Sequence, residues 1–486
     1  MQRGRESRGP QKGQKGQRGG GAGHHHNNKP TSSSASTASI ATKKAVSQPP
    51  TKPVGTKHER LWKNIQDDSR REELLKQQHF DAAAWKAWFD YYSALGDRTS
   101  VRAMRILVQE GTFQTCQQLR YFLPSSTFSA ASTEPKEQKG DEESEENEGE
   151  EVEEGTKKPT RATVSLLPSR EALLQQVRSN KWYEFDATGR DVPGGLKSFA
   201  AVRGQHIRRK RWQRTSVEVV QGDCIEAALE LKLGRGMRPA VLNMASYRRP
   251  GGGYRNGAGA QEENLFRRSN YYQSLEDPEG LDKGRKWHYP LPEFGGIYSP
   301  QVVVFRAAED KGYAYLPEPV PLDFIAVAAY ARPSLEGGKK QKTFGKDQEP
   351  RMTSKLAEAT KNKIRTILAI ALDNDHDSLV LSAFGCGAYG NPPGHMARLF
   401  HNVIRKEFNG YFKHITFAIF DDHNSRKAHN PRGNVIPFQE IFPKETNMFD
   451  DEPELQPPTK KTNEKEKEQE EEEEQEKASK GASSSS

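Results

Sequence analysis

The chain has 486 residues, 33% of them hydrophobic, and a mean hydropathy of −0.93. That length has room for two or three domains, but so low an apolar content indicates one sizeable folded domain between polar segments. The formal net charge is +8, and the three cysteines are too few and too widely spaced for a disulfide framework or a metal cluster. We therefore expect a cytoplasmic or nuclear protein that binds no metal ion or cofactor.

The N-terminal segment is strongly basic, with eleven Lys and Arg residues against one acid, Glu6, over residues 1–57. Its Gly, Gln, Ser and Pro content predicts a disordered arm over residues 1–56. Such an arm attracts polyanions, and its Arg-Gly and Gln-Lys-Gly repetition suits RNA, although a tail that only solubilises the protein fits equally well. The first thirty residues hold no apolar segment of signal-peptide length, so we expect no membrane insertion.

Three further segments precede or follow the main domain. Apolar residues recur at helical spacing over residues 57–124, with a break at Gly96-Asp97, and predict a small helical element of unassigned function. Residues 125–159, almost wholly acidic between Asp141 and Glu154, predict a disordered linker because like charges repel. Residues 446–486 are rich in Glu, Lys and Ser and predict a disordered charged tail.

Between the linker and the tail, over residues 160–445, strand-like runs alternate with helical patterns, as in an α/β fold. Six runs predict strands: Val217–Val220, Ala240–Met244, Val302–Arg306, Phe324–Ala329, Leu379–Ala383 and Ile415–Phe420. Most are continuously apolar, which is typical of a sheet covered on both faces. The clearest helix spans Lys355–Ala371, with Ser354 as its predicted N-cap.

Three glycines, Gly251, Gly252 and Gly253, follow the second of these strands. Lacking Cβ atoms, they allow positive φ angles and a close approach of the main chain to a ligand. After seven intervening residues come Gln261, Glu262 and Glu263. Two adjacent carboxylates buried together repel each other, which raises at least one pKa towards neutrality and suits acid/base work on a glycosidic bond. Alone, this pattern also fits a turn followed by a solvated acidic helix start.

A second glycine-rich loop follows the predicted strand Leu379–Ala383. It contains, in order, Gly385, Cys386, Gly387, Ala388, Tyr389, Gly390 and Asn391. Its glycines let successive amides converge on an anion, and a helical pattern after Pro393 adds a favourable dipole. Both loops begin where the strands of an open α/β sheet end, the usual place for a ligand. The alternative is a tight structural turn.

These motifs together resemble a known enzyme family. The stretches Asn243-Met244-Ala245, Arg249 to Gly253 and Gln261-Glu262-Glu263 resemble the signature of the bacterial-type (microbial-type) poly(ADP-ribose) glycohydrolases, which are macrodomain enzymes. Leu379 to Pro392 resembles that family's second phosphate loop, with Tyr389 where members often have Phe. Gln221 to Ile225 is similar to the turn with which macrodomains receive adenine. The resemblance covers residues 160–445 and implies a macrodomain-like three-layer α/β/α mixed sheet.

The resemblance also implies roles for individual residues. Glu263 would be the catalytic acid/base, Glu262 would position ribose hydroxyls, and both glycine-rich loops would hold the diphosphate. Asp223 would accept from the adenine amino group and Asn243 would contact the distal ribose, although a helix cap and a satisfied strand-end amide are equally consistent with these two. Gln261 would fix the loop, since an amide does not titrate.

Three functions remain open from the sequence. The first is hydrolysis of ribose-ribose bonds in poly(ADP-ribose), releasing ADP-ribose from chain ends, by a monomer acting on the polymer or on ADP-ribosylated protein. The second is a non-catalytic ADP-ribose reader, which has no need for paired acids. The third is a mono-ADP-ribosyl hydrolase, which nothing in the sequence excludes. Two insertions, Glu276–Glu293 and the Lys-rich Gly337–Asp347, are expected to cover or reshape the cleft.

Overall fold

The computed structural model describes residues 80–123, 163–186, 197–206, 212–336, 350–421 and 429–443, together with residues 52, 210, 425 and 427. Every described element belongs to the unit Pro50–Ser486. The predicted basic arm (apart from residue 52), the acidic linker, the charged tail and the insertion Gly337–Asp347 lie outside the described residues, as does the helical element before residue 80.

The helices fall into an N-terminal pair and a set that surrounds the sheet. They are α3 (Ala82–Ala94), α4 (Arg98–Gln118), α5 (Arg170–Arg178), α6 (Phe199–Gln205), α7 (Cys224–Leu229), α8 (Gln261–Arg268), α9 (Tyr271–Leu275), α10 (Ser354–Asp373), α11 (Pro393–Val403) and α12 (Val435–Ile441). Short π-helical turns, η3 (Glu230–Gly234) and η7 (Ile404–Phe408), extend α7 and α11, and 3-10 turns form η4 (Tyr254–Asn256) and η5 (Glu309–Lys311). No helix among these described segments is long and apolar enough to cross a membrane.

The strands form one large mixed sheet and a separate two-stranded sheet. They are β1 (Arg120–Leu123), β2 (Thr163–Leu166), β3 (Lys181–Asp186), β4 (Lys197–Ser198), β5 (Ser216–Gln221), β6 (Pro239–Met244), β7 (Gly295–Arg306), β8 (Tyr315–Val327), β9 (Ser378–Leu381) and β10 (His414–Ile419). The pair β1-β2 is antiparallel, and the large sheet has the order β4-β3-β7-β8-β6-β9-β10-β5.

The strands around the middle of the sheet point the same way. Strand β6 is parallel to β8 and β9, and β10 is parallel to β9 and β5, whereas β7 is antiparallel to both β8 and β3. Parallel neighbours end at the same edge. The loops after β6 and β9, which carry the two glycine-rich motifs, therefore leave from one edge of the sheet.

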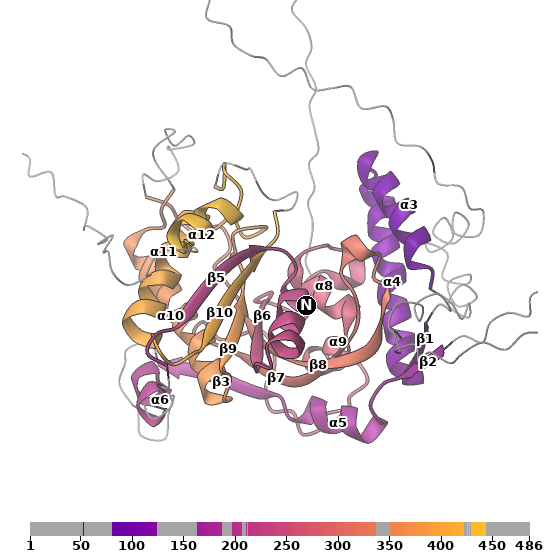
Figure 1. Cartoon of the computed structure of the whole chain (residues 1–486), viewed down its shortest axis with the longest axis horizontal. Helices are drawn as coiled ribbons and strands as arrows, with labels where there is room; N and C mark the ends of the chain where they lie inside the picture. Colours follow the sequence, from indigo (N-terminus) through magenta and orange to yellow (C-terminus); the bar gives the residue numbers. More distant parts are fainter. Residues whose placement is uncertain are drawn as a thin grey trace, which may run out of the picture. The chain divides into compact units, whose positions relative to one another are not determined.

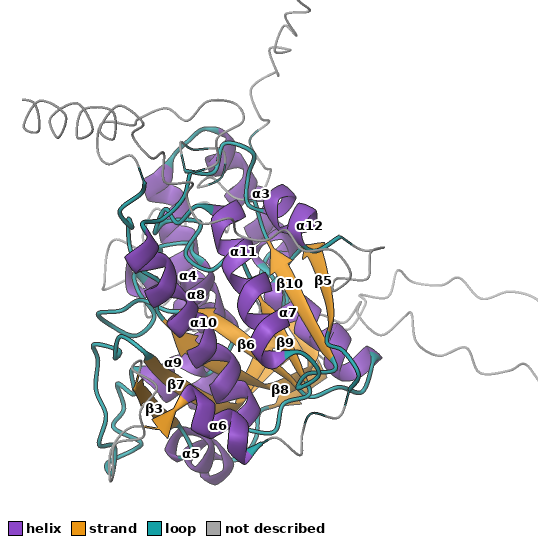
Figure 2. Cartoon of the chain, turned by 90° about the vertical axis from the view of Figure 1, so that its left-hand side faces the viewer, coloured by secondary structure: helices purple, strands orange, loops and turns teal. Residues whose placement is uncertain are grey.

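Each face of the sheet has its own hydrophobic core. Ala240 and Leu242 of β6 pack with α6, α10, α11 and α12, whereas Val241 between them packs with α4, α5, α7, α8 and α9. The change of face at each residue follows from the alternation of side chains along a strand. The result is the expected three-layer α/β/α arrangement. In Figure 2, α10 and α11 lie in front of the strands. In Figure 1, α8 and α9 lie on the opposite side of the sheet from α10, α11 and α12.

The six predicted strands are all present, with shifted ends, and the Gly96-Asp97 break separates α3 from α4, where Asp97 caps α4. One local prediction was wrong. Ser354 is the first residue of α10, and the capping position belongs to Thr353, whose side chain makes no cap hydrogen bond. The helix is held instead by its buried face, from Ile364 to Leu372.

Candidate active site

The two adjacent acids lie on the first turn of α8 and are both buried, with Glu262 3% and Glu263 8% exposed. The positive end of the helix dipole favours carboxylates at this position. The burial removes the interpretation of the motif as a solvated helix start. The acids instead turn inward, towards the loop that contains the glycine triplet.

Glu262 is held by the main chain of that loop. One of its oxygens, Oε2, accepts from the amide of Ser246 at 2.7 Å, and the other, Oε1, accepts from the amide of Gly251 at 3.1 Å and from Nδ2 of Asn243 at 3.4 Å. Burial raises the pKa of Glu262 to about 8, with a further increase from the charge of Glu263, while the two amides act in the opposite direction. Glu262 therefore retains its proton near neutral pH.

Glu263 has one oxygen fixed and one oxygen without a partner. Its Oε1 accepts from the amide of Gly253 at 2.9 Å, whereas Oε2 is buried and has no hydrogen-bond partner among the described residues. Gly252, with a φ of +54°, makes room for this carboxyl group, because a Cβ there would lie 2.5 Å from Oε1. Of the two acids, Glu263 thus has the oxygen that is available to another group.

Gln261 and Asn243 connect α8 to the end of β6. The Gln261 amide accepts from the main chain of Met244 at 2.8 Å and donates to the carbonyl of Leu242 at 2.7 Å. Asn243 is fully buried and donates to both Glu262 and the hydroxyl of Tyr271, each at 3.4 Å. These contacts fix the start of α8 against the sheet. The contact of Asn243 with a ribose stays a prediction.

The second glycine-rich loop is a tight turn in which several amides donate to no described residue. Gly385 and Gly390 have positive φ angles, and the buried Asn391 side chain closes the turn by donating to the carbonyls of Tyr330 and Gly385. Cys386 has a buried side chain, and its carbonyl accepts from His429. Among hydrogen bonds between described residues, none uses the amides of Gly387, Ala388 or Tyr389. Three consecutive amides of this kind suit an anion.

Tyr389 brings the two loops together. Its hydroxyl contacts the main chain of Tyr247 and the side chain of Ser246, both in the loop after β6. Burial, and then the charges of Glu262 and Glu263, raise the pKa of Tyr389, so the ring lies within electrostatic range of both acids. The second loop therefore lies close to the acid pair through Tyr389. Among the described residues, no His, Cys, Asp or Glu cluster is placed to hold a metal ion.

Asp223 lies at the N-terminus of α7 and its carboxylate is occupied by the protein. It accepts from the amides of Ile225 and Glu226 at 3.0 Å each, as a helix cap does, and it pairs with the buried Arg268 at 2.8 Å. The capping alternative weighed from the sequence is thus present in the structure. Its contact with an adenine stays a prediction.

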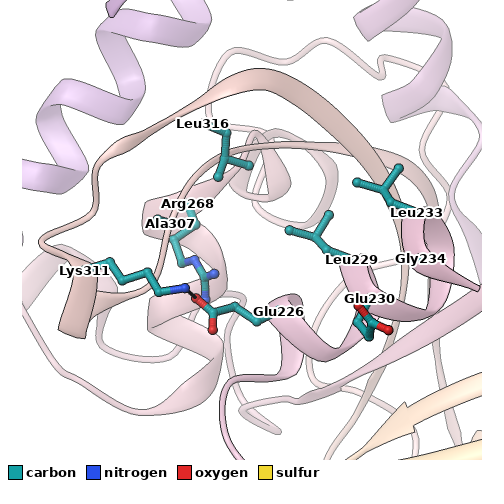
Figure 3. A pocket seen from close by; sticks show the side chains of 9 residues that line it. All are labelled: Glu226, Leu229, Glu230, Leu233, Gly234, Arg268, Ala307, Lys311 and Leu316. Atoms are coloured by element: carbon teal, nitrogen blue, oxygen red, sulfur yellow. Dashed lines mark ion pairs between the residues drawn. The ribbon is translucent and has the colours of Figure 1, made fainter. Parts of the chain in front are cut away.

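A cavity of about 460 Å³ lies beside this ion pair. Figure 3 shows it between α7 with η3 on one side and the β7–β8 connection on the other, with the pair Glu226–Lys311 across it. Its wall includes Arg268 and the apolar Leu229, Leu233 and Leu316, but neither Glu262 nor Glu263. The cavity is therefore separate from the acid pair.

Comparisons with known proteins agree with this geometry. Residues 170–307 match the family model "Microbial-type PARG, catalytic domain". This segment contains the glycine triplet, both acids and Asp223. Residues 170–307 are therefore similar to the catalytic domain of microbial-type PARGs.

Solved structures of poly(ADP-ribose) glycohydrolase (PARG) resemble the chain as well. One is the enzyme from Thermomonospora curvata bound to the inhibitor ADP-HPD, 24% identical, covering 70% of this chain and 99% of its own, with a TM-score of 0.44. Another is the enzyme from Deinococcus radiodurans in complex with ADP-ribose, 28% identical, covering 55% of this chain and 96% of its own, with a TM-score of 0.41. Among curated proteins, none matches the sequence.

Two parts of the candidate site and its surroundings lie outside the matched segment. One is the second glycine-rich loop, which the sequence motif found and which Tyr389 joins to the site. The other is α4, whose Thr112 donates to the carbonyl of Arg267 in α8 at 2.5 Å. Sequence reasoning gave α4 no role, because its only visible signal was a helical spacing of apolar residues that any packed helix shows.

Proposed function

We propose that this protein hydrolyses the ribose-ribose O-glycosidic bonds of poly(ADP-ribose) and releases ADP-ribose from chain ends. Glu263 is the acid/base and Glu262 orients a ribose hydroxyl next to the bond that breaks. The observation that carries the proposal is the buried pair on α8, in which Glu263 has one oxygen fixed by Gly253 and the other without a protein partner. A reader has no use for two carboxyl groups held in this way.

The chemistry follows from that arrangement. In its protonated form Glu263 donates its proton to the glycosidic oxygen, the bond between that oxygen and the ribose C1 breaks, and the ribose becomes oxocarbenium-like. Glu263, now a carboxylate, removes a proton from a water molecule whose oxygen bonds to C1, and the acid is restored. The diphosphate next to the second loop stabilises the cation. A positioned acid/base accounts for about 10² to 10⁴ of the rate, and orientation in the cleft for much of the remainder.

Binding is assigned to groups around the acids. The amides of Gly387, Ala388 and Tyr389 face an anion, and the remaining loop residues Gly385, Cys386, Gly390 and Asn391 hold their geometry. The ring of Tyr389 packs on the distal ribose, Asn243 contacts that ribose, and Asp223 accepts from the adenine. The triplet of Gly251, Gly252 and Gly253 lets the diphosphate approach the main chain.

The test is the variant Glu263→Gln, which keeps the size of the side chain and removes its proton chemistry. We expect it to lose release of ADP-ribose from labelled poly(ADP-ribose) while ADP-ribose affinity stays within the same order of magnitude. The matched control is Glu226→Gln in the separate cavity, which should cleave at the wild-type rate. Turnover by Glu263→Gln, or loss of turnover in Glu226→Gln alone, would remove the acid pair from the mechanism.

The same assay separates the other candidate functions. A wild-type protein that binds ADP-ribose but releases none from polymer or from mono-ADP-ribosylated protein is a reader. One that acts only on mono-ADP-ribosylated protein is a mono-ADP-ribosyl hydrolase. Gel filtration of the same preparation tests the proposed monomer.

Two finer proposals concern the surroundings of the enzyme. We assign the basic arm, residues 1–57, to contact with RNA or with the polymer itself, on the strength of its charge. We also assign the protein to the cytoplasm or the nucleus, because its three cysteines are free and buried. Fluorescence microscopy of the tagged full chain tests the location, and a secreted protein would contradict it.

A further inference from the structure

Helix α4 lies against the stretch of chain that joins the glycine triplet to the two acids. The carbonyl of Arg102 and the guanidinium of Arg105 pack so closely on Gly257 and Gly259 that an added Cβ would meet them at 2.3 Å in each case. Phe113 packs its ring against Tyr254, which follows the triplet directly, with the ring centroids 6.3 Å apart. In both cartoon views α4 runs beside α8.

Helix α4 also binds the far end of α8. The buried Thr112 hydroxyl donates to the carbonyl of Arg267 at 2.5 Å, and the buried Gln109 amide donates to the carbonyl of Phe266 at 3.4 Å. These are among the last carbonyls of α8, which have no partner inside their own helix. Helix α4 thus supplies hydrogen-bond donors to carbonyls at the end of α8, the helix that carries the two acids.

A charged network continues the same contact. Arg105 of α4 forms two hydrogen bonds with Glu309, at 2.7 and 2.8 Å, and Glu309 accepts from the hydroxyl of Tyr313 at 2.9 Å. Arg267 of α8 donates to that same hydroxyl at 2.9 Å and to the carbonyl of Ala258 at 2.8 Å. One chain of contacts therefore links α4, the end of α8 and the loop before it.

We infer that α4 is a brace for the acidic helix, and that Thr112 is a positioning residue that sets where the carboxyl groups of Glu262 and Glu263 stand relative to the glycine triplet. The inference rests on the proposed function and goes beyond it, because α4 lies outside residues 170–307. Helix α8 has only eight residues, so a shift at its last turn moves its first turn. The start of α8 is tied to β6 by Gln261, and its end is tied to α4 by Thr112.

The test compares two buried threonines of α4. Thr112→Val keeps the shape and removes the donor to Arg267, and we expect kcat to fall about 10- to 100-fold with KM little changed, because a shift of the order of 1 Å costs about that much. The control is Thr115→Val, since Thr115 is equally buried and bonds Gly111 and Tyr315 but not α8. It should lose stability without losing kcat, and Thr112→Ser, which restores the hydroxyl, should recover the wild-type kcat.

If Thr112 had only a structural role, kcat would fall equally in both valine variants, or would stay unchanged in folded Thr112→Val. Either result overturns the inference. If Thr112→Val does not fold, Gln109→Met decides. This substitution removes the donor to Phe266 and also removes the Gln109 Oε1, which is buried and has no partner among the described residues. Stability should therefore be kept, while kcat falls by less than in Thr112→Val. An unchanged kcat in that variant overturns the inference.

Hydrogen exchange separates this inference from the proposed function. In the protein without substrate, the amides of residues 257–268 should exchange faster in Thr112→Val than in Thr115→Val. If the wild-type protein cleaves no polymer, the proposed function fails, and this difference in exchange still decides whether the brace exists. Equal exchange in the two variants refutes the brace even in an active enzyme.

Discussion

Gly252→Ala places a methyl group directly against the two acids. The new Cβ would stand 2.5 Å from Oε1 of Glu263 and 3.3 Å from the nearest oxygen of Glu262. An ordinary contact of this kind is 3.4 Å or longer, so the Glu263 carboxyl group must retreat by about 0.9 Å. The substitution therefore displaces the proposed acid/base without changing its chemical identity.

The expected cost follows from that distance. A misplacement of about 1 Å in a catalytic group reduces the rate by about 10²-fold, so we expect kcat for release of ADP-ribose to fall by about that factor. The φ of +54° adds about 1–2 kcal/mol of strain for any residue with a Cβ, which lowers the melting temperature as well. KM should change less than kcat, because the amides of the second loop are not touched.

Two alanine variants calibrate the measurement. Gly253→Ala has an ordinary φ and would meet Ala258 at 2.9 Å while standing 3.7 Å from Glu263, so its main effect should be on KM. Gly222→Ala meets nothing within 4 Å and should behave as the wild type. The assay is initial-rate hydrolysis of labelled polymer at several concentrations, with melting curves for each protein. A folded Gly252→Ala that retains the wild-type kcat would refute the proposal that Glu263 is positioned by the space at Gly252.

Three further predictions concern charge. Because burial raises the pKa of Glu262 to about 8, the folded state holds a proton that the unfolded state releases near 4.5; stability is therefore full below pH 4.5 and decreases up to pH 8. Denaturant titrations should show Glu262→Gln flattening this decrease, while Glu358→Gln, whose ion pairs with Lys361 and Arg365 lower its pKa, should keep it. Asp223→Ala should cost about 3 kcal/mol in unfolding free energy, because Arg268 stays buried without its partner; a cost near zero in urea titrations would contradict this. Deleting residues 1–57 should weaken binding of RNA or polymer and reduce its salt dependence; an unchanged salt slope would indicate a solubility tail.

The central strands were predictable from sequence because they are buried on both faces. Strands β6, β9 and β10 are apolar and almost entirely buried, so composition alone identifies them. Strand β3 escaped because it is half exposed and paired on the antiparallel side of the sheet. Its sequence from Lys181 to Asp186 mixes charged and aromatic residues, with neither a continuous apolar run nor a regular alternation to identify a strand.

The first half of β8 was hidden by prolines. Pro317, Pro319 and Pro321 stand at alternate positions, and a proline normally argues against an inner strand because it lacks an amide donor. Strand β6 pairs with β8 only from Asp323 onward, so before that residue β8 has only β7 beside it for its main-chain hydrogen bonds in the large sheet. Prolines at every second position leave the amides facing β7 intact. The sequence alone does not show which strands lie beside each half of β8.

The site was predictable as a set of motifs but not as a set of contacts. Glycine spacing and paired acids, taken together with the resemblance to a known family, predicted a shared site, and the structure holds both acids against the triplet. The sequence held no sign that Asp223 pairs with Arg268, 45 residues later, or that Thr112 reaches Arg267 across 155 residues. Such contacts depend on the packing of whole helices, which local patterns do not encode.

The hydrogen bonds of the glycine triplet suggest that the two glycine-rich loops have different roles. The amides of Gly251 and Gly253 donate to Glu262 and Glu263, and the amide of Gly252 points to the carbonyl of Arg249 at 3.4 Å. A diphosphate that took the amides of the triplet would compete with the acids for them, whereas the three amides after Cys386 are occupied by no described residue. We therefore propose that the triplet, besides letting the diphosphate approach the main chain, holds the two acids and gives Glu263 the space that a Cβ would fill, and that amides of the second loop bind most of the substrate's charge.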